Sequence, residues 1–392
     1  MVWQYRHTVL TLCTLAFTAT MVARLIISPL VPSITAEFSV STGAVGFALT
    51  VMWTAYALVQ FPSGVFADRY GERTVILASV GLTAVSCLLL AVSPSFVLFA
   101  IVAAVLGVGA GLHYSVATTF LARQFDQVGR AIGIHVSGGP IAGLVAPVAA
   151  AAVGARYGWR VAMLLGVAAA APIFVAFALR IRTTPPAKPE LSMRSRFEFG
   201  PLRELLGRPA IAHTTLIAVG GAFTWQATAS FLPAFLIGYH GYSAAFASLL
   251  FSAYFVVHGT TQPLMGGISD RIGRDETAAF AFALGVVGYG TLVVGGGTAV
   301  IAVATVVVGV SMSWGAPIQS RFIDVLSEDE RAAGFGLVRT VYMLLGATGS
   351  VAVGVLADVA GWATAFGLLV AILALETTLV AVPALRRRMR TG

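Results

Sequence analysis

Two arginines stand within long apolar segments of this chain, and their side chains could bind an anion. Arg24 follows Thr8 by 16 residues, which is roughly 24 Å along a helix and too far for the side chain to reach back to that end. Arg339 follows Arg331 by eight residues, about 12 Å, so it could still reach the nearer interface. A charge at membrane depth usually marks function, and a guanidinium can hold a carboxylate through two hydrogen bonds. We expect Arg24, and with it Arg339, to bind an anionic substrate; the alternatives are arginines that extend to an interface or, for Arg24, cap a kink near Pro29.

Polar and aromatic side chains recur at helical spacing in two other apolar segments. The two stripes are Trp53, Tyr56 and Gln60 in one segment, and Tyr254, His258 and Gln262 in the other. Spacings of three and four residues place each set on one face of a helix. We expect these faces to line a solute cavity; the alternative is hydrogen bonding between helices. The other candidates for substrate contact are His113, Trp225, Gln226 and Trp314.

The elements that carry these residues must be membrane helices. The chain has 392 residues, of which 58% are hydrophobic and only 10% charged, and its mean hydropathy is +0.90. So few charged residues cannot form the polar surface of a soluble protein. Continuous apolar runs predict helices and exclude an alternating β-barrel. The predicted spans are 8–33, 42–65, 74–92, 95–121, 131–154, 159–180, 209–237, 243–266, 277–296, 298–321, 332–356 and 362–384.

The distribution of basic residues predicts the orientation of these twelve spans. Apart from Arg24 and Arg339, nearly all basic residues fall in segments on the same side of the membrane as the N-terminus. The loops on the opposite side hold only Arg156 and Arg160. The basic side is the cytoplasmic one by the positive-inside rule. Both termini are therefore expected in the cytoplasm. The net charge of +8 reflects membrane topology and predicts no nucleic-acid partner.

The two halves of the chain repeat each other. Asp270 follows Asp68 by 202 residues within similar surroundings, and the same offset relates Ser230 to Ser28. A constant offset over several spans predicts two equivalent bundles of six helices. We place the first bundle at 1–180, a Pro-rich and basic cytoplasmic linker at 181–208, and the second bundle at 209–392.

A short motif recurs in the loops that follow the second and eighth spans. The first copy consists of Gly64, Asp68, Arg69, Gly71 and Arg73, and the second of Gly266, Asp270, Arg271, Gly273 and Arg274. Twelve spans, a six-plus-six division and this repeated loop resemble the major facilitator superfamily over essentially the whole chain. The resemblance implies that both loops gate the inner side, with Asp68 pairing with a basic group or helix N-terminus and Arg123 joining that network. From the residues alone, Gly64 is expected to allow close helix approach and Gly71 a tight turn.

The fifth span contains Gly139, Pro140 and Gly143, which resemble the core of a motif associated with proton-coupled export in this superfamily. The upstream glycine of that motif is His135 here, and the arginine often found in the fourth span of drug–proton antiporters is Ala103. The alternative is simply a kinked and closely packed helix.

A coupling proton, if one is carried, has several candidate sites. Glu376 is the only carboxylate deep within a span, but the resemblance places the twelfth span at the periphery. His113, His135 and His258 titrate nearer neutral pH, and the sequence singles out none of them.

We therefore expect an all-α membrane protein of the cytoplasmic membrane with the major facilitator fold, acting as a secondary transporter of a small organic anion. The alternatives are proton-coupled efflux of drug-like amphipaths and a membrane sensor that transports nothing. The sequence contains no nucleotide-binding loop, metal-ligand cluster or nucleophile–base pair, so we expect no enzyme, metal or cofactor. The expected partners are a small-molecule substrate, possibly a coupling proton, and lipid, with the monomer as the functional unit.

Overall fold

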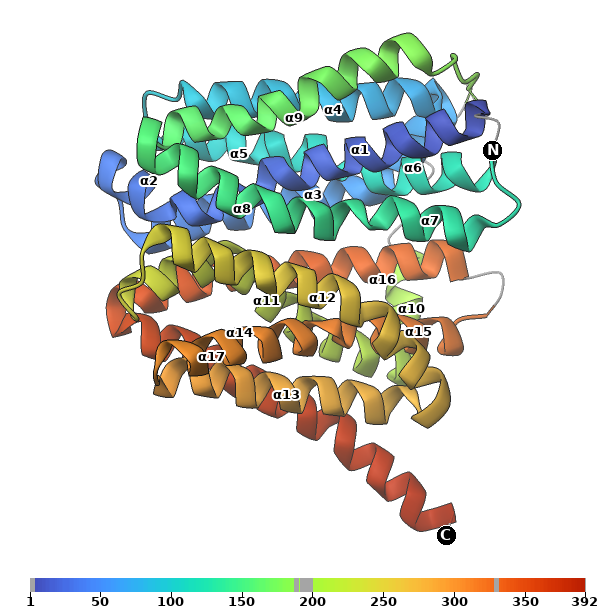
Figure 1. Ribbon diagram of the computed structural model, residues 1–392. Helices are drawn as coiled ribbons and strands as arrows, with labels where there is room; N and C mark the ends of the chain where they lie inside the picture. The colour runs from blue at the N-terminus through green and yellow to red at the C-terminus, as the bar shows by residue number, and fades with distance from the viewer. Residues whose placement is uncertain (1–3, 187–189, 191–199, 328–330, 392) are drawn as a thin grey trace. The chain divides into compact units, whose positions relative to one another are not determined.

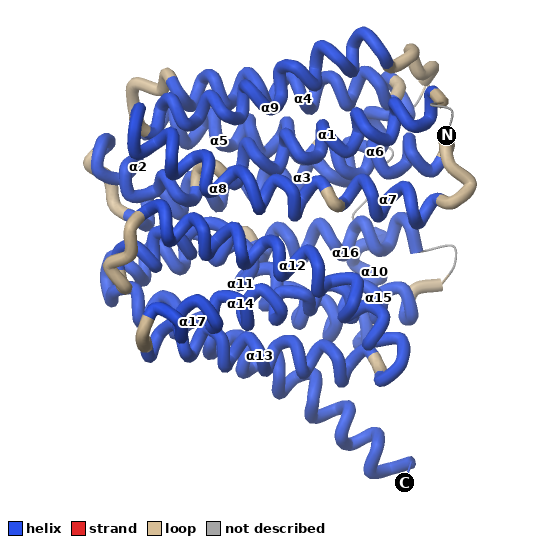
Figure 2. Tube along the Cα trace, viewed as in Figure 1, coloured by secondary structure: helices blue, strands red, loops and turns tan. Residues whose placement is uncertain are grey.

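The structure is a computed structural model, and its described residues are 4–186, 190, 200–327 and 331–391. Within these ranges the regular secondary structure is helical, and Figure 2 shows helices joined by short loops. Part of the predicted linker, residues 187–189 and 191–199, lies outside the described residues. So do the side chains of 383–392, which include the basic tail.

The chain forms two compact units, the first comprising residues 1–40 and 47–197 and the second residues 41–46 and 198–392. The helices up to the linker are α1 (Tyr5–Leu25), η1 (Ser28–Leu30), α2 (Val31–Phe38), α3 (Thr42–Tyr70), α4 (Glu72–Ala91), α5 (Phe96–Gly111), α6 (His113–Ala122), α7 (Val128–Val136), α8 (Gly138–Tyr157) and α9 (Trp159–Arg180) (Figure 1). Those after it are α10 (Gly200–Gly207), α11 (Pro209–Gly238), α12 (Ala244–Ile272), α13 (Arg274–Val294), α14 (Thr298–Ser311), η3 (Met312–Trp314), α15 (Gly315–Val325), α16 (Arg331–Gly346) and α17 (Thr348–Thr391).

The helices fall where the apolar runs predict them. Ten stretches of the described chain are long and apolar enough to cross a membrane. The last of these, Gly334–Val382, holds two predicted spans, separated at Gly361 by a non-helical backbone with φ of 81°. The predicted span outside the ten is α11, whose Gln226 and several threonines make it more polar. The twelve predicted spans are thus accounted for.

Several spans are broken near their middle, so that polar backbone lies at depth. The first span breaks between α1 and α2, where Pro29 cannot donate a backbone hydrogen bond and Leu30 N donates to Ile27 O at 3.0 Å. The fourth span breaks at Leu112, and the tenth breaks across η3. Arg24 consequently lies in the last turn of α1, directly before a break.

Matching helix contacts in the two units reproduce the sequence repeat. A Cβ on Gly107 of α5 would overlap the backbone carbonyl oxygen of Met52. A Cβ on Gly309 of α14 would lie 2.9 Å from the carbonyl oxygen of Tyr254. Both members of the second pair follow those of the first by 202 residues. Each unit therefore uses a glycine at the same place to bring two helix backbones together, and the predicted pseudo-symmetry is confirmed.

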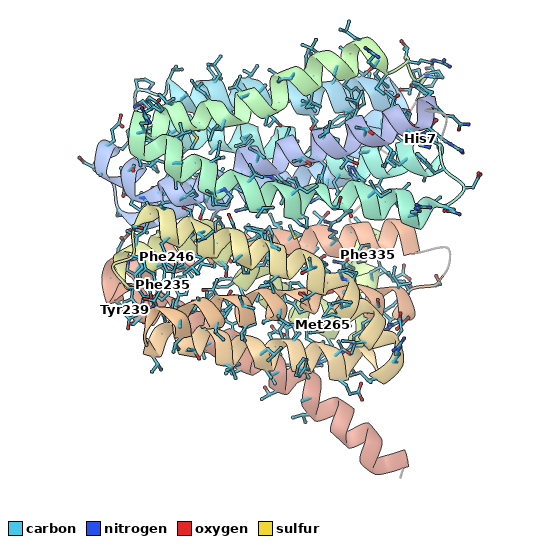
Figure 3. All side chains as sticks on the ribbon, in the orientation of Figure 1. His7, Phe235, Tyr239, Phe246, Met265 and Phe335 are labelled. Atoms are coloured by element: carbon cyan, nitrogen blue, oxygen red, sulfur yellow. The ribbon has the colours of Figure 1, made fainter. Side chains whose placement is uncertain are left out.

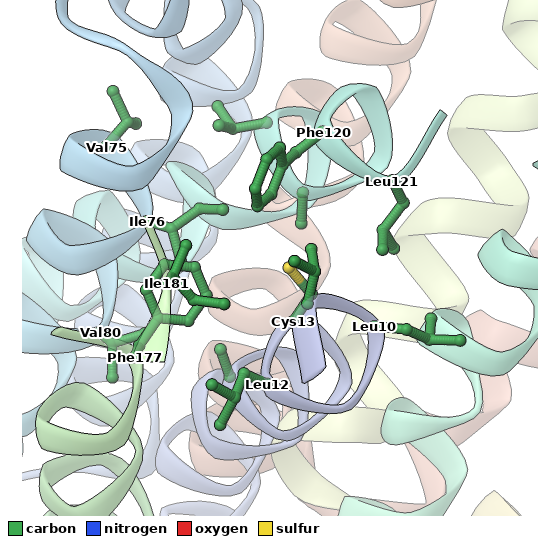
Figure 4. Packing of buried hydrophobic residues seen from close by; sticks show 14 of the residues in the cluster. Leu10, Leu12, Cys13, Val75, Ile76, Val80, Phe120, Leu121, Phe177 and Ile181 are labelled. Atoms are coloured by element: carbon green, nitrogen blue, oxygen red, sulfur yellow. The ribbon is translucent and has the colours of Figure 1, made fainter. Parts of the chain in front are cut away.

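A continuous apolar core fills the first unit between α1, α4, α6 and α9. Figure 4 shows part of it, in which Cys13 of α1, Ile76 of α4, Phe120 of α6 and Phe177 of α9 converge. All four are buried. In the second unit, α13 packs against α14 and α17, and α11 packs against α16 and α17. These cores hold the broken helices, and hence the polar residues at the breaks, in place.

Candidate functional site

Arg24 is buried inside the first unit and held on an aromatic wall. Its side chain is 3% exposed, and its guanidinium carbon lies 4.3 Å from the ring centre of Tyr56 and 5.1 Å from that of Trp53. Arg24 Nε donates to Thr20 O at 3.1 Å, and Nη2 donates to Met21 Sδ at 2.8 Å. Both acceptors precede Arg24, so the side chain turns back along α1 and does not cap the break at Pro29.

The charge of Arg24 is not balanced by a carboxylate. Across the described part of the chain, the ion pairs join other residues and none includes Arg24. A guanidinium has five N–H donors, more than Thr20 and Met21 use. Aromatic faces stabilise the cation without neutralising it. This arrangement suits an anion that completes the hydrogen bonding and supplies the missing charge.

The polar stripe of α3 is buried as well. Trp53, Tyr56 and Gln60 are each at most 7% exposed, and the Trp53 and Tyr56 rings meet edge to face at 5.9 Å. The first two contact Arg24, whereas Gln60 lies one turn further along the helix. The spacing-based prediction of a shared face agrees with this placement, which joins the stripe to the arginine.

His113 contacts a different group of residues. Its ring stacks on Phe17, with the ring centres 6.2 Å apart, and its Nε2 lies 3.2 Å from the carbonyl oxygen of Cys13. The ring centre of His135 is 5.5 Å away. The structure thus pairs the two histidines on one side of α1.

In the second unit the predicted residues form separate contacts. Tyr254 and His258 stack with ring planes 9° apart and centres 6.2 Å apart, as their spacing predicts. Gln226 is fully buried, and its Nε2 donates to Met343 O at 3.1 Å. The neighbouring Trp225 ring meets Phe255 at 6.5 Å.

The remaining predicted contacts of this unit are spread over three helices. Trp314, in η3, stacks on Phe282 at 6.0 Å, and its ring leaves no room for a Cβ on Gly221. The Gln262 amide lies beside Gly315, and Arg339 is partly buried on α16. These side chains therefore do not form one contiguous cluster through the contacts described.

Glu376 is not at a lipid-facing periphery. It is 3% exposed, and a Cβ on Gly220 of α11 would overlap its carboxylate. The missing side chain at Gly220 provides the space that the carboxylate occupies. A polar group so placed faces the protein interior, contrary to the expectation from the resemblance.

The first repeated loop forms the expected turn but a different ion pair. Gly71 has φ of 81°, a conformation in which glycine is favoured. Arg123 pairs with Glu72 at 2.5 Å, and its predicted place in a network with Asp68 stays a prediction. Glu72 directly follows the turn as the first residue of α4, where the helix dipole favours an acid. No described atom lies within 4 Å of a Cβ built on Gly64, so the close helix approach expected there is absent.

The basic residues of the loops bind local partners. Arg73 donates to Ile181 O and Ala178 O at 2.9 and 2.7 Å and so caps the C-terminal end of α9. In the second unit, Arg274 pairs with Asp270 and, at 3.1 Å, with Asp324. The side chains of Arg69 and Arg271 are at most partly buried. Gly266 and Gly273 complete the second loop, and Gly273 again has a positive φ, of 113°.

Replacing Arg123 with alanine is expected to lower the stability of the first unit by about 2 kcal/mol, because the buried Glu72 carboxylate loses its charged donor. Thermal unfolding of the purified protein would measure the loss. In a Glu72→Gln background the same replacement should cost much less. Equal losses in both backgrounds would show that Arg123 acts independently of Glu72.

The fifth span breaks where glycine and proline predict a kink. α7 ends at Val136 and α8 begins at Gly138, with Pro140 in its first turn. The closest packing involves Gly138, where a Cβ would press on Thr14 and Thr18 of α1. Gly139 lies less tightly against Phe17 and Met21, and Gly143 is buried in α8.

The profile of the Major Facilitator Superfamily matches residues 12–247 and 214–391. The chain belongs to this family. It thus has the multi-pass membrane fold of this family, with its helices in two bundles. Transporters of this family are not enzymes.

Solved transporters share the fold. A bacterial homolog of the human lysosomal transporter Spinster, inward-facing and occupied, has a TM-score of 0.82 at 16% identity, covering 98% of both chains. The D-xylose–proton symporter has a TM-score of 0.77 at 16% identity, covering 97% of both. At these identities the likeness concerns the fold alone.

Curated relatives differ in what their names say they transport. The multidrug resistance protein B homolog of Mycobacterium tuberculosis is 30% identical over 38% of this chain, and the match spans only 28% of that protein's length. The probable sulfoacetate transporter SauU of Cupriavidus necator is 24% identical over 72% of this chain and 69% of its own. The nitrite extrusion protein of Bacillus subtilis is 24% identical over 71% and 69%.

Three residues that make the contacts described above were not named from the sequence. Met21 precedes Arg24 by three residues, and Phe17 precedes it by seven, so helical spacing from Arg24 could have found both. Glu72 lies within the repeated loop and was passed over for Asp68. The His113–His135 contact joins two different helices, and no local spacing reveals it.

Proposed function

We propose that the chain transports a small organic anion across the cytoplasmic membrane by alternating access, with both termini in the cytoplasm. The observation that supports this most is Arg24: a buried guanidinium, 3% exposed, at a helix break deep in the first span. Its aromatic neighbours leave its charge uncompensated. A buried cation of this kind is costly unless an anionic ligand uses it.

Two relatives support an anionic substrate. The names of the sulfoacetate transporter and the nitrite extrusion protein both refer to anions. Each relative matches about 70% of this chain. Sulfonate, carboxylate and nitrite oxygens all accept parallel hydrogen bonds from a guanidinium fork. We assign substrate contact in the first unit to Arg24, Tyr56 and Gln60.

The second unit supplies its own proposed contacts. They are Trp225, Gln226, Tyr254, His258, Gln262, Trp314 and Arg339. Tyr254 Oη, His258 Nδ1 and Trp314 Nε1 are buried without a hydrogen-bond partner among the described residues. Buried polar groups usually have partners, so these atoms are suited to a bound solute. We propose further that the two repeated loops gate the inner side and that the monomer is the working unit.

Transport by proteoliposomes tests this proposal directly. Vesicles loaded with unlabelled sulfoacetate or nitrite should accumulate the same radiolabelled anion by saturable counterflow. Labelled xylose, a neutral solute, serves as the control and should not accumulate. Absence of counterflow for every anion tried, by protein that is folded and inserted, would contradict anion transport.

Efflux of drug-like amphipaths is the second candidate. It is favoured by the relative named for multidrug resistance and by the helix break beside Pro140 in the fifth span. On this alternative, cells producing the protein should survive a dye panel, and protection should depend on Gly139 and Pro140. If these cells are as sensitive to the dyes as cells that lack the protein, drug efflux is contradicted.

A further inference from the structure

Two fully buried histidines meet inside the first unit. His113 begins α6 and His135 lies in the last turn of α7, and both are 0% exposed. Their ring centres are 5.5 Å apart. Phe17 of α1 contacts both rings, at 6.2 Å from His113 and 5.1 Å from His135. The pair therefore belongs to the interior of one compact unit, beside the helix that carries Arg24.

The ring nitrogens of the pair have room for a proton. A carbonyl oxygen can only accept, so the contact with Cys13 O requires that His113 Nε2 carries hydrogen. In the neutral ring, His113 Nδ1 then has a free lone pair, and it has no partner in the described part of the chain. The His135 ring also lies near the backbone of Cys13, whose carbonyl oxygen can only accept a hydrogen bond. Neutral His135 must therefore also present one unshared lone pair.

Aromatic rings lie against the two histidines. Phe17 lies against both rings, and the Tyr114 ring centre is 6.2 Å from His135. Aromatic faces attract a cation through their negative π surface. A proton on either imidazole would be attracted by these faces, whereas a second proton would meet the charge of the first.

A cavity lies near the pair, at the N-terminal ends of α1 and α7. It has a volume of about 430 Å³, and its lining includes Arg6, His7, Asp126, Leu10 and Ala131. Figure 3 shows His7 at the N-terminal end of α1, the end that we place in the cytoplasm. Leu10 precedes Cys13, whose carbonyl contacts His113, by three residues, and Ala131 precedes His135 by four. The lining of the cavity therefore lies about one helical turn from the pair.

The charged and titratable groups near the pair come from five helices. On the packed helices they are Tyr5, Arg6, His7, Cys13 and Arg24 of α1, Tyr114 of α6, Arg130 of α7, Arg156 and Tyr157 of α8, and Glu72, Arg73 and Cys87 of α4, while α5 has none. Glu72 is paired with Arg123, and Arg73 binds the end of α9. Arg24 follows Phe17 by seven residues, about 10 Å along α1. Its positive charge opposes protonation of the pair until an anion neutralises it.

We propose that His113 and His135 form one proton-binding site, and that the proton there and the anion at Arg24 favour each other's binding. The proton passes from water in the cavity to a ring nitrogen lone pair, and the pair changes from neutral to singly positive. No other bond is made or broken. The consequence is anion–proton symport, an inference that rests on the proposed anion transport.

Calorimetry of the full-length protein in detergent tests anion binding and proton binding separately. Titration with sulfoacetate and with nitrite near pH 6, in buffers of different ionisation enthalpy, yields both the affinity and the number of protons taken up. The wild type should take up about one proton per anion, because the two binding events are linked. The double variant His113→Gln/His135→Gln should still bind the anion, within about tenfold of the wild-type affinity, but take up no proton.

Single variants keep the test informative should the double variant fail to fold. His113→Gln and His135→Gln should each lower the proton number, and the control His240→Gln, in the loop between α11 and α12, should not change it. Anion binding without proton uptake by the wild type, or full uptake by the histidine variants, would overturn the proton site while leaving anion transport intact. Failure of the wild type to bind either anion would instead contradict the proposed function, and symport with it.

A pH gradient supplies a second readout. With the outside acidic, wild-type proteoliposomes should accumulate labelled anion several-fold above the level reached without a gradient. The histidine variants should lose this stimulation. Stimulation that persists in them would place the coupling proton elsewhere, for example at Glu376.

Discussion

Replacing Arg24 with alanine should reduce kcat/KM for anion counterflow by about two to three and a half orders of magnitude. Removing one partner of a buried charge pair costs about 3–5 kcal/mol, and each 1.4 kcal/mol is about a factor of ten. The loss should appear in affinity as well as rate, because the guanidinium would contact the anion directly. Counterflow of labelled sulfoacetate or nitrite, over a range of concentrations, measures both.

Two matched variants sharpen this prediction. Arg24→Lys keeps the charge but loses the planar fork, so it should recover only part of the activity. Arg156→Ala is the control, because Arg156 also lies over a tyrosine, 5.5 Å from the ring centre of Tyr157, but is exposed. It should transport as the wild type does. An Arg24→Ala protein that binds the anion with wild-type affinity would remove the basis for an anionic substrate.

Replacing Gly107 or Gly309 with valine should destabilise the protein by about 3 kcal/mol or more, since overpacking of a close backbone contact forces helices apart. At Gly107 the added Cβ would overlap Met52 O, and at Gly309 it would press on Tyr254 O. The two glycines occupy equivalent places in the repeat, so both variants should be affected. Melting of the detergent-purified protein, followed by tryptophan fluorescence, would show the effect.

The matched control for these glycines is Gly64→Ala. Gly64 is also within a helix, but a Cβ there has open space around it, so its melting temperature should remain unchanged or rise slightly. A Gly107→Val protein that melts within about 2 °C of the wild type would contradict the close contact between α3 and α5, because a loss of several kcal/mol shifts melting by more than this.

Much of the fold could be predicted because a bilayer restricts what a chain can do. Apolar runs must be helices, since lipid cannot satisfy the backbone, and α9 spans Trp159–Arg180 as its run predicts. The 202-residue offset carries over to three dimensions in the contacts of Gly107 and Gly309. The depth of Arg24 could also be predicted, because every residue of a helix adds the same rise and Arg24 lies far from the start of α1.

Neighbours on different helices were harder to predict. Arg123 pairs with Glu72, the first residue of α4, a partner that was not named from the sequence. The resemblance placed Glu376 at the periphery. In the structure its carboxylate lies in the interior, in the space that a side chain on Gly220 would fill. In each case the partner depends on how one helix is rotated against the next, a quantity that no local pattern contains.

The sequence by itself determined which segments cross the membrane, that they repeat, and that an arginine lies too deep to reach water along its own helix. These features depend on hydropathy and helical rise, which are local properties. Only the tertiary structure decided that aromatic rings rather than an acid surround Arg24, and that His113 meets His135. Such contacts arise when breaks and glycines set the angle and distance between helices, so they depend on the packing of the whole unit.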